Sequence, residues 1–510
     1  MAYDKSTTSQ YAQWYGTRRV LEELRKKSPD ILVDGRQQYH WFGTWTWLAG
    51  TYPHPMMSDE QPGSYQNFPD LHFDRVSANR QRFAAYLYRM QEFCPIEILP
   101  GYMTHQTPRI NDKHECPRDR FRAKNWDYLG WKYSVISSIG AAPMQNVVNM
   151  LPARDEQELA AFGKQDQAWL KQWLDWTDEN QVLLKKMRAI IGPPAMGRID
   201  GTAACIENRG FVFLVNPNYR ALASEFNRNG SVGLTNGEKF ILKQLYPRQG
   251  IVLGKPEAGA WSYGDKVPVS IKGPEAMVLE VVPLENVKDT LLMNATGSAK
   301  VDGGQLVLHG VLGNAGRKTD LQIMLAGDAK IQSVNVNGVA LPAFSQNGRL
   351  VRVPVTFAGS TVEQCPQIGA YDPTFANRTF KTEMSIPKSV FDQLAARKKA
   401  WPITCTPEEL RCTWLGPDRL LLCVNIAEPN HKSEATLKID GKTVELKKAF
   451  SSIAVDAETQ TFTGFYADVS DLKPDAKYEV ELSLPELNPG QFQGLFLENV
   501  EPVYTGEVLK

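Results

Sequence analysis

The fold of this chain is decided by the stretch Ile31-Leu32-Val33-Asp34-Gly35-Arg36 and by the loop residues that follow it. An apolar run that breaks into a polar loop is typical of a parallel strand that leaves the core and enters a functional loop. An aromatic segment that includes Tyr39, Trp41 and Trp45 comes next, and then the carboxylates of Ser58-Asp59-Glu60. Aromatic faces match the apolar face of a pyranose ring. The stretch therefore predicts one wall of a pocket that binds sugars.

Outward from this stretch, helical and strand patterns alternate from residue 1 to about residue 190. Helices are predicted over Tyr11–Lys27, Arg75–Phe93, Asp127–Ile136 and Asp155–Ile191, and strands over Ile31–Val33, Ile96–Pro100 and Val147–Leu151. Alternation of this kind predicts a barrel of βα units. On the last helix, Trp169, Trp173 and Trp176 fall near one face, and we expect them in the core rather than on a sugar platform.

From Gly201 onward the pattern changes to short strands separated by turn residues. The clearest strands are Phe211–Val215, Met277–Pro283, Leu306–Leu308, Leu420–Val424 and Tyr478–Leu482, and Asp440-Gly441 is a hairpin-turn signal. Such a pattern predicts antiparallel β-sandwiches. The expected fold class is α/β followed by β. A partial TIM-type barrel is predicted over residues 1–198, a β-sandwich over 199–285, and one or two further sandwiches, carbohydrate-binding-like, over 286–510.

The first region is short for a complete barrel, which takes about 250 residues. Three or four βα units can be recognised in it. An open half-barrel would expose sheet edges and a broad apolar face to water. We therefore expect that upstream sequence or another polypeptide supplies the missing half of the barrel, or that the units present close in an unusual way.

Composition restricts the class of protein further. The chain has 510 residues, of which 42% are hydrophobic and 10% aromatic, and its 57 basic side chains balance 57 acidic ones. Such a chain is typical of a soluble globular protein and makes nucleic acid and membrane surfaces unexpected partners. The 7 cysteines have no paired metal spacing, and free thiols that pack as small hydrophobic groups are the favoured interpretation.

The N-terminal residues contain no apolar signal segment, and no run of about eighteen apolar residues occurs. The sequence as written predicts a cytoplasmic protein. If the natural N-terminus lies further upstream, a periplasmic or secreted protein is the alternative. Homo-oligomerisation is compatible with the sequence.

The order of these features resembles a known enzyme family. A strand ends in a Gly-Arg loop, and an aromatic segment, Ser58-Asp59-Glu60, a long helix and the strand region Pro100-Gly101-Tyr102-Met103-Thr104-His105 follow. This order resembles the C-terminal half of the catalytic barrel in the α-galactosidase (melibiase) superfamily of retaining glycoside hydrolases, where an antiparallel sandwich follows the barrel. The chain departs from the family at Val33-Asp34-Gly35, where a Cys-Gly-Gly-Gly run is usual.

The resemblance implies hydrolysis of α-linked sugars by double displacement, which needs one carboxylate as nucleophile and one as acid/base. Asp59 matches the family's acid/base position. Glu60 beside it remains an alternative, as does a turn or N-cap role for Asp59. The candidate nucleophile is Asp4, or else a residue upstream of Met1.

The same resemblance implies which residues hold the substrate. Arg36 matches the arginine that contacts the sugar, Asp34 ends the strand that faces the site, and His105 matches a substrate hydrogen-bond donor. Tyr39, Trp41 and Trp45 would form the aromatic platform, and Glu60 is a further candidate for contact with the substrate.

No cofactor or metal is expected, because His40, His54 and His105 have no ligand spacing. The expected partner is an oligo- or polysaccharide. A non-catalytic carbohydrate-binding protein, or an inactive enzyme fragment, is the alternative from another class.

Overall fold

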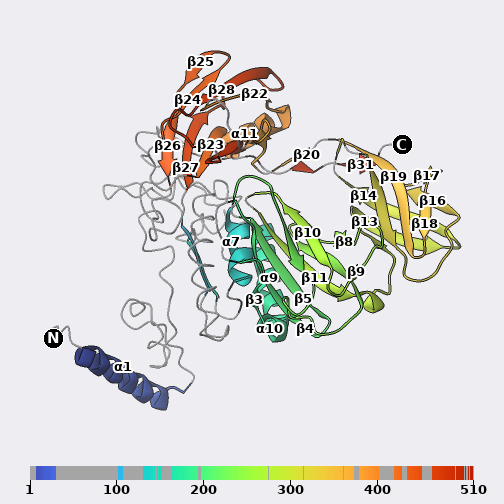
Figure 1. The fold of residues 1–510 in the computed structure, drawn as a ribbon, viewed down its shortest axis with the longest axis horizontal. Coiled ribbons are helices and arrows are strands. Elements are labelled where there is room, and N and C mark those ends of the chain that lie inside the picture. The colour runs from blue at the N-terminus through green and yellow to red at the C-terminus, as the bar shows by residue number, and fades with distance from the viewer. Residues whose placement is uncertain are drawn as a thin grey trace.

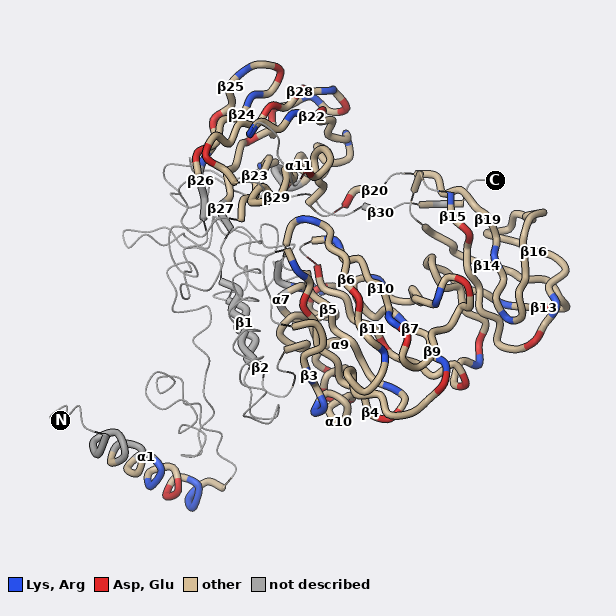
Figure 2. Tube along the Cα trace, viewed as in Figure 1, with Lys and Arg blue, Asp and Glu red and all other residues tan. Residues whose placement is uncertain are grey.

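A computed structural model describes residues 7–29, 101–106, 130–151, 164–400, 419–450 and 462–508, apart from gaps of one to five residues inside these ranges. The helix α1 (Thr7–Lys27) agrees with the predicted helix Tyr11–Lys27. Its last turn carries Arg25, Lys26 and Lys27, where cations interact favourably with the helix dipole. Figure 2 shows both signs of charge interspersed over the rest of the described chain.

One βαβ unit follows in the described residues. It consists of β1 (Gly101–Gln106), α7 (Gly130–Ile139) and β2 (Asn146–Leu151), and β1 and β2 pair in parallel. The predicted helix Asp127–Ile136 and strand Val147–Leu151 are thus confirmed to within a few residues. The predicted elements Ile31–Val33, Arg75–Phe93 and Ile96–Pro100 lie outside the described residues, and the partial barrel remains a prediction.

The long helix predicted over Asp155–Ile191 is wrong in its second half. The structure has α9 (Lys164–Glu179), a single turn α10 (Gln181–Leu184) and a strand β3 (Arg188–Ala189). At Asn180, just after α9, the side-chain Nδ2 donates a hydrogen bond to the carbonyl of Trp176 at 2.8 Å, beside the backbone N–H of the same residue at 3.1 Å. Asparagine side chains compete for backbone hydrogen-bonding groups in this way. Apolar residues that follow Asn180 belong to α10 and β3, not to a continued α9.

The first β module, residues 188–283, is an antiparallel sheet of strand order β3-β4-β5-β11-β7-β8, with β9 beside β7, and a second pair β10-β6. Its other strands are β4 (Asp200–Ile206), β5 (Arg209–Asn216), β6 (Leu222–Asn227), β7 (Lys239–Tyr246), β8 (Val252–Leu253), β9 (Trp261–Ser262), β10 (Lys266–Ile271) and β11 (Glu275–Pro283).

Alternate residues of β5 serve the two faces of this sheet, as strand geometry requires. Phe211 and Phe213 pack in a core with α7, α9 and α10, whereas Val212 and Leu214 pack in a core with β6 and β10. Figure 1 shows the helices on one side of the sheet and β10 on the other. Trp173 is 4% exposed in the helix-side core, with Trp169 and Trp176 packed against it, so the prediction that these tryptophans are core residues is confirmed.

The second β module follows a short 3-10 helix, η3 (Leu284–Asn286). In the described chain its strand order is β12-β15-β19-β31-β14-β16-β17, with β13 beside β14 and β18 beside β19. The strands are β12 (Leu291–Leu292), β13 (Thr296–Asp302), β14 (Gln305–Leu312), β15 (Lys318–Met324), β16 (Ser333–Val336), β17 (Val339–Leu341), β18 (Ser345–Asn347), β19 (Leu350–Ala358) and the distant β31 (Glu507–Val508).

The third β module is built from two antiparallel sheets, β21-β29-β23-β27-β26 and β22-β28-β24-β25, and from α11. The elements are β21 (Gln367–Ile368), β22 (Thr379–Ser385), α11 (Lys388–Ala400), β23 (Leu421–Ala427), β24 (Thr436–Ile439), β25 (Lys442–Val444), β26 (Lys447–Phe450), β27 (Phe462–Asp468), β28 (Lys477–Ser483) and β29 (Phe492–Glu498). The predicted hairpin turn is confirmed: Asp440 and Gly441, with φ of 48° and 74°, join β24 to β25.

The third β module is inserted into the second. β20 (Thr361–Val362) enters it and β30 (Val503–Tyr504) leaves it, and these two strands pair with each other. The chain then returns to the second module, where β31 pairs with β14 and β19 (Figure 1). The prediction of antiparallel β structure after about residue 200 is confirmed. The boundaries at 198/199 and 285/286 stay predictions.

Candidate functional site

Most of the predicted site residues lie outside the described residues. These are Asp4, Asp34, Arg36, Tyr39, Trp41, Trp45, Asp59 and Glu60. Their catalytic and sugar-binding roles therefore stay predictions. Of the predicted set, the structure describes the backbone of His105, which lies in β1.

His105 is the penultimate residue of β1 and lies opposite Met150 in the parallel register with β2. The two strands run from Gly101 opposite Asn146 to Gln106 opposite Leu151, so their carboxyl ends meet at one edge. Ligands of open α/β sheets bind outside the carboxyl ends of the strands, and the active sites of barrels lie at that face too. His105 thus occupies the edge at which a substrate contact is expected.

The βαβ unit is fastened to the first β module through α7, which packs against β1 and β11. Just after α7, the carbonyl of Gly140 accepts a hydrogen bond from the hydroxyl of Thr202 in β4. Lys132 of α7 forms an ion pair with the nearly buried Asp166 of α9 at 3.2 Å. These contacts fix the carboxyl edge of β1 and β2 relative to the antiparallel sheet.

The loop after β5 is held by two buried asparagines. Asn216 donates from Nδ2 to the carbonyls of Arg220 and Ile271, each at 2.9 Å, and its Oδ1 accepts from the backbone N–H of Asn218 at 3.0 Å. Asn218 in turn donates to the carbonyl of Arg198 at 3.2 Å. The sequence predicts a strand over Phe211–Val215 and no anchoring loop after it. The repeated asparagine was the available signal, because this residue satisfies backbone groups in turns.

This rigid loop contacts the third β module. The ring of Tyr219 stacks on Phe496 of β29 with 5.1 Å between centroids, and the guanidinium of Arg220 lies 3.9 Å from the ring centroid of Tyr371. Lys272, between β10 and β11, forms an ion pair with Glu363 beyond β20. The asparagine-held loop is therefore an anchoring point between modules that are distant in sequence.

Glu275, at the start of β11, has a strongly perturbed carboxyl pKa. Burial raises its pKa to about 7, and the nearby Lys272 and Arg248 oppose that rise. A carboxyl group that titrates near neutrality is a common feature of functional sites, although structural groups share it. Its position opposite Asn216 in β5 places it beside the loop that anchors the third module.

The described cysteines are buried free thiols, Cys205, Cys365 and Cys423. Burial raises the pKa of Cys205 to about 12, and it also raises that of Cys365. A thiol with a raised pKa is a poor nucleophile and metal ligand. This agrees with the prediction of cysteines packed as small hydrophobic groups.

Nowhere in the described ranges do three or more His, Cys, Asp or Glu side chains gather in a way that could hold a metal ion. Among the described helices, none combines the length and the apolar character needed to cross a membrane.

No protein-family model matches this sequence, and no curated protein does. Similar solved structures include an Anoxybacillus α-amylase, with 11% identity, a TM-score of 0.34, and coverage of 53% of this chain and 56% of that chain. They also include a glycoside hydrolase family 86 β-porphyranase from Bacteroides plebeius, at 10% identity and a TM-score of 0.15, with coverage of 61% and 37%.

A third similar structure is wild-type BuGH86 in complex with neoagarooctaose, at 11% identity and a TM-score of 0.25, with coverage of 97% of this chain and 69% of that chain. The chain thus spans less than two thirds of the length of the α-amylase and the porphyranase. All of these TM-scores are below 0.5, so the likenesses do not establish a shared fold or activity.

Proposed function

We propose that this protein is a glycoside hydrolase that acts on α-linked sugars by a retaining mechanism, as the α-galactosidase superfamily does. The single observation that supports it best is the β1–α7–β2 unit. Its carboxyl edge carries His105, and the antiparallel sheet of the first β module packs directly behind it. A parallel βα unit followed by an antiparallel sandwich is the order that the sequence resemblance implies.

In the proposed mechanism, Asp59 protonates the leaving oxygen and then activates water, and Asp4 is the candidate nucleophile. Asp34, Arg36 and His105 would hold the hydroxyl groups of the sugar. Tyr39, Trp41 and Trp45 would offer aromatic faces to the apolar side of its ring. Glu60 is the alternative acid/base, because it is adjacent to Asp59 in the sequence.

The test is hydrolysis of a panel of aryl α- and β-glycosides by the whole chain and by four variants, Asp59→Asn, Glu60→Gln, Asp4→Asn and Asp178→Asn. The last changes an exposed carboxylate on α9 and serves as the control. Loss of an acid/base group costs about 10²–10⁴-fold in rate. We expect that loss for Asp59→Asn and wild-type turnover for the control. The anomer released first, followed by NMR, should have the configuration of the substrate.

An equal rate for wild type and Asp59→Asn would contradict the assignment of the acid/base, and loss in Glu60→Gln alone would transfer the role to Glu60. Absence of turnover on every glycoside, with binding of sugar intact, would favour the alternative of a non-catalytic carbohydrate-binding protein.

A further inference from the structure

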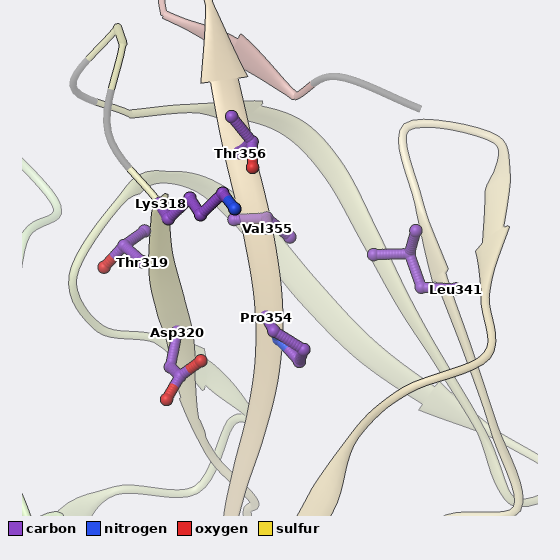
Figure 3. A pocket seen from close by; sticks show the side chains of 7 residues that line it. All are labelled: Lys318, Thr319, Asp320, Leu341, Pro354, Val355 and Thr356. Atoms are coloured by element: carbon purple, nitrogen blue, oxygen red, sulfur yellow. The ribbon is translucent and has the colours of Figure 1, made fainter.

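An open hollow of ≈ 430 Å³ lies on the second β module, and the proposed reaction makes no use of it. Figure 3 shows its lining side chains, which come from β15, from β19 and from the end of β17: Lys318, Thr319, Asp320, Leu341, Pro354, Val355 and Thr356. Its volume falls in the range of roughly 300–1,000 Å³ that is usual for sites that bind small molecules. A single sugar unit or a short segment of a polysaccharide is a ligand of suitable size.

The strand register explains why polar groups line one wall. β15 and β19 pair antiparallel, with Lys318 opposite Thr356 and Asp320 opposite Pro354. Alternate residues of a strand point to the same face. Lys318 and Asp320 are exposed on one face. Leu321 and Ile323, farther along β15, point to the other face and lie in the core. The polar groups therefore stand on paired strands, which hold a binding geometry better than loops do.

The charges of this wall are available to a ligand. In the described residues, neither the ammonium of Lys318 nor the carboxylate of Asp320 takes part in an ion pair or a side-chain hydrogen bond. A carboxylate can accept hydrogen bonds from two adjacent hydroxyls, and an ammonium group donates up to three. One charge of each sign leaves the hollow with no net charge, which favours a neutral ligand rich in hydroxyl groups over a phosphate.

Apolar side chains complete the lining of the hollow. Leu341 points toward Pro354 and Val355 across the hollow (Figure 3). A pyranose ring combines hydroxyl groups at its edge with C–H groups on its face, so polar and apolar side chains suit it together. The described lining contains no aromatic ring, which implies modest affinity for a single sugar and a role in holding a longer chain.

We propose that this hollow is a carbohydrate-binding subsite, remote in sequence from the predicted catalytic residues, that retains a neutral polysaccharide on the second β module. The choice of a carbohydrate rests on the proposed function, but binding at this hollow does not require turnover.

The experiment is affinity electrophoresis of the whole chain in gels that contain galactomannan, starch or agarose. The test variant is Lys318→Ala/Asp320→Ala. The matched control is Lys300→Ala/Asp302→Ala, which removes the same two charges, at the same spacing, from the exposed side of β13 in the same module. We expect retardation of the wild type and the control in at least one gel, and a dissociation constant at least tenfold weaker in the test variant.

Far-UV circular dichroism and melting temperature of both variants should equal those of the wild type, since all the altered side chains are exposed. Retardation that is equal in the test variant and the wild type would overturn the inference, as would absence of retardation in every gel. Turnover of small aryl glycosides by the same variants separates the two proposals. If retardation depends on Lys318 and Asp320 while no glycoside is hydrolysed, the subsite stands and the proposed hydrolase function fails.

Discussion

The two faces of the sheet in the first β module use the same strands but pack in different ways. On the helix side, aromatic rings dominate: Trp176 lies 4.6 Å from Phe211 and 5.2 Å from Trp173 between centroids. On the β6–β10 side the core is mainly aliphatic, and a fully buried arginine, Arg228, has its guanidinium 4.0 Å from the ring centroid of Phe240. The face that fastens the βαβ unit is thus packed by large interlocking rings, whereas the other face tolerates a buried charge.

The largest effect should follow from removal of the central ring on the helix side. Trp173→Ala should destabilise the protein by about 3–5 kcal/mol, because a buried tryptophan loses its transfer free energy and leaves a cavity. The control is Leu174→Ala on the same helix, where 45% of the side chain is exposed and the loss should be below about 1 kcal/mol. Urea unfolding measures both. Equal losses would contradict the importance of this ring cluster.

The next effect concerns the close approach of α7 to the sheet. A Cβ at Gly140 would lie 2.8 Å from the ring of Phe213, so Gly140→Ala should cost about 1–3 kcal/mol by overpacking. At Gly230 a Cβ would meet no atom within 4 Å, and Gly230→Ala should change stability by less than about 0.5 kcal/mol. Thermal unfolding of the two variants tests this. A neutral Gly140→Ala would show that the βαβ unit can shift on the sheet.

On the other face, Glu275 should make stability depend on pH. Its folded-state pKa of about 7 lies above the ordinary glutamate value of 4.5, so the folded state binds the proton more tightly. The associated stability is complete below pH 4.5 and is lost as the pH rises through about 7. Glu275→Gln should remove this loss. The difference in unfolding free energy between the variant and wild type should therefore rise by on the order of 1 kcal/mol, in favour of the variant, from pH 4 to pH 7.5.

The measurement is the free energy of unfolding in urea at several pH values for wild type and both glutamine variants. The matched control is Glu280→Gln on the same strand, β11. If Glu275→Gln and Glu280→Gln change the pH profile alike, the assignment to Glu275 fails.

The smallest effect is expected at Arg228. Burial lowers the pKa of this arginine to about 10, an effect that Asp265 opposes. In the described residues its guanidinium nitrogens have no hydrogen-bond partner. Buried charges are often replaced by apolar residues at no cost. Arg228→Met should therefore leave stability unchanged or raise it by on the order of 1 kcal/mol, because Asp265 keeps Lys255 at 3.1 Å as its partner.

The control for this variant is Arg209→Met on β5, where the side chain is exposed and the change should stay within about 0.5 kcal/mol. A loss of more than about 2 kcal/mol in Arg228→Met would show that the guanidinium has polar partners that stabilise the fold.

Local pattern predicted much of the fold. The periodicity of apolar residues over a few turns or strand residues predicts the helix α1, the strand Val147–Leu151 and the core position of the tryptophans on α9. The same reasoning failed at Asn180, where the apolar period continues but the helix α9 has ended. Of the candidate site, the structure describes the backbone of His105 in β1, and its substrate contact stays a prediction, whereas the sequence missed the loop held by Asn216 and Asn218.

The sequence by itself determined the type of several elements, such as α1, α7 and β2, and the core position of Trp173, because these depend on propensity and on periods of 3.6 and 2 residues. Only the tertiary structure decided which strands pair. The return of β31 to β14 and β19, and the insertion of the third β module between β20 and β30, join residues 141 to 195 positions apart in sequence. The hollow at Lys318 and Asp320 also exists only through such pairing, because β15 supplies its charged side chains and β17 and β19 supply its apolar side chains.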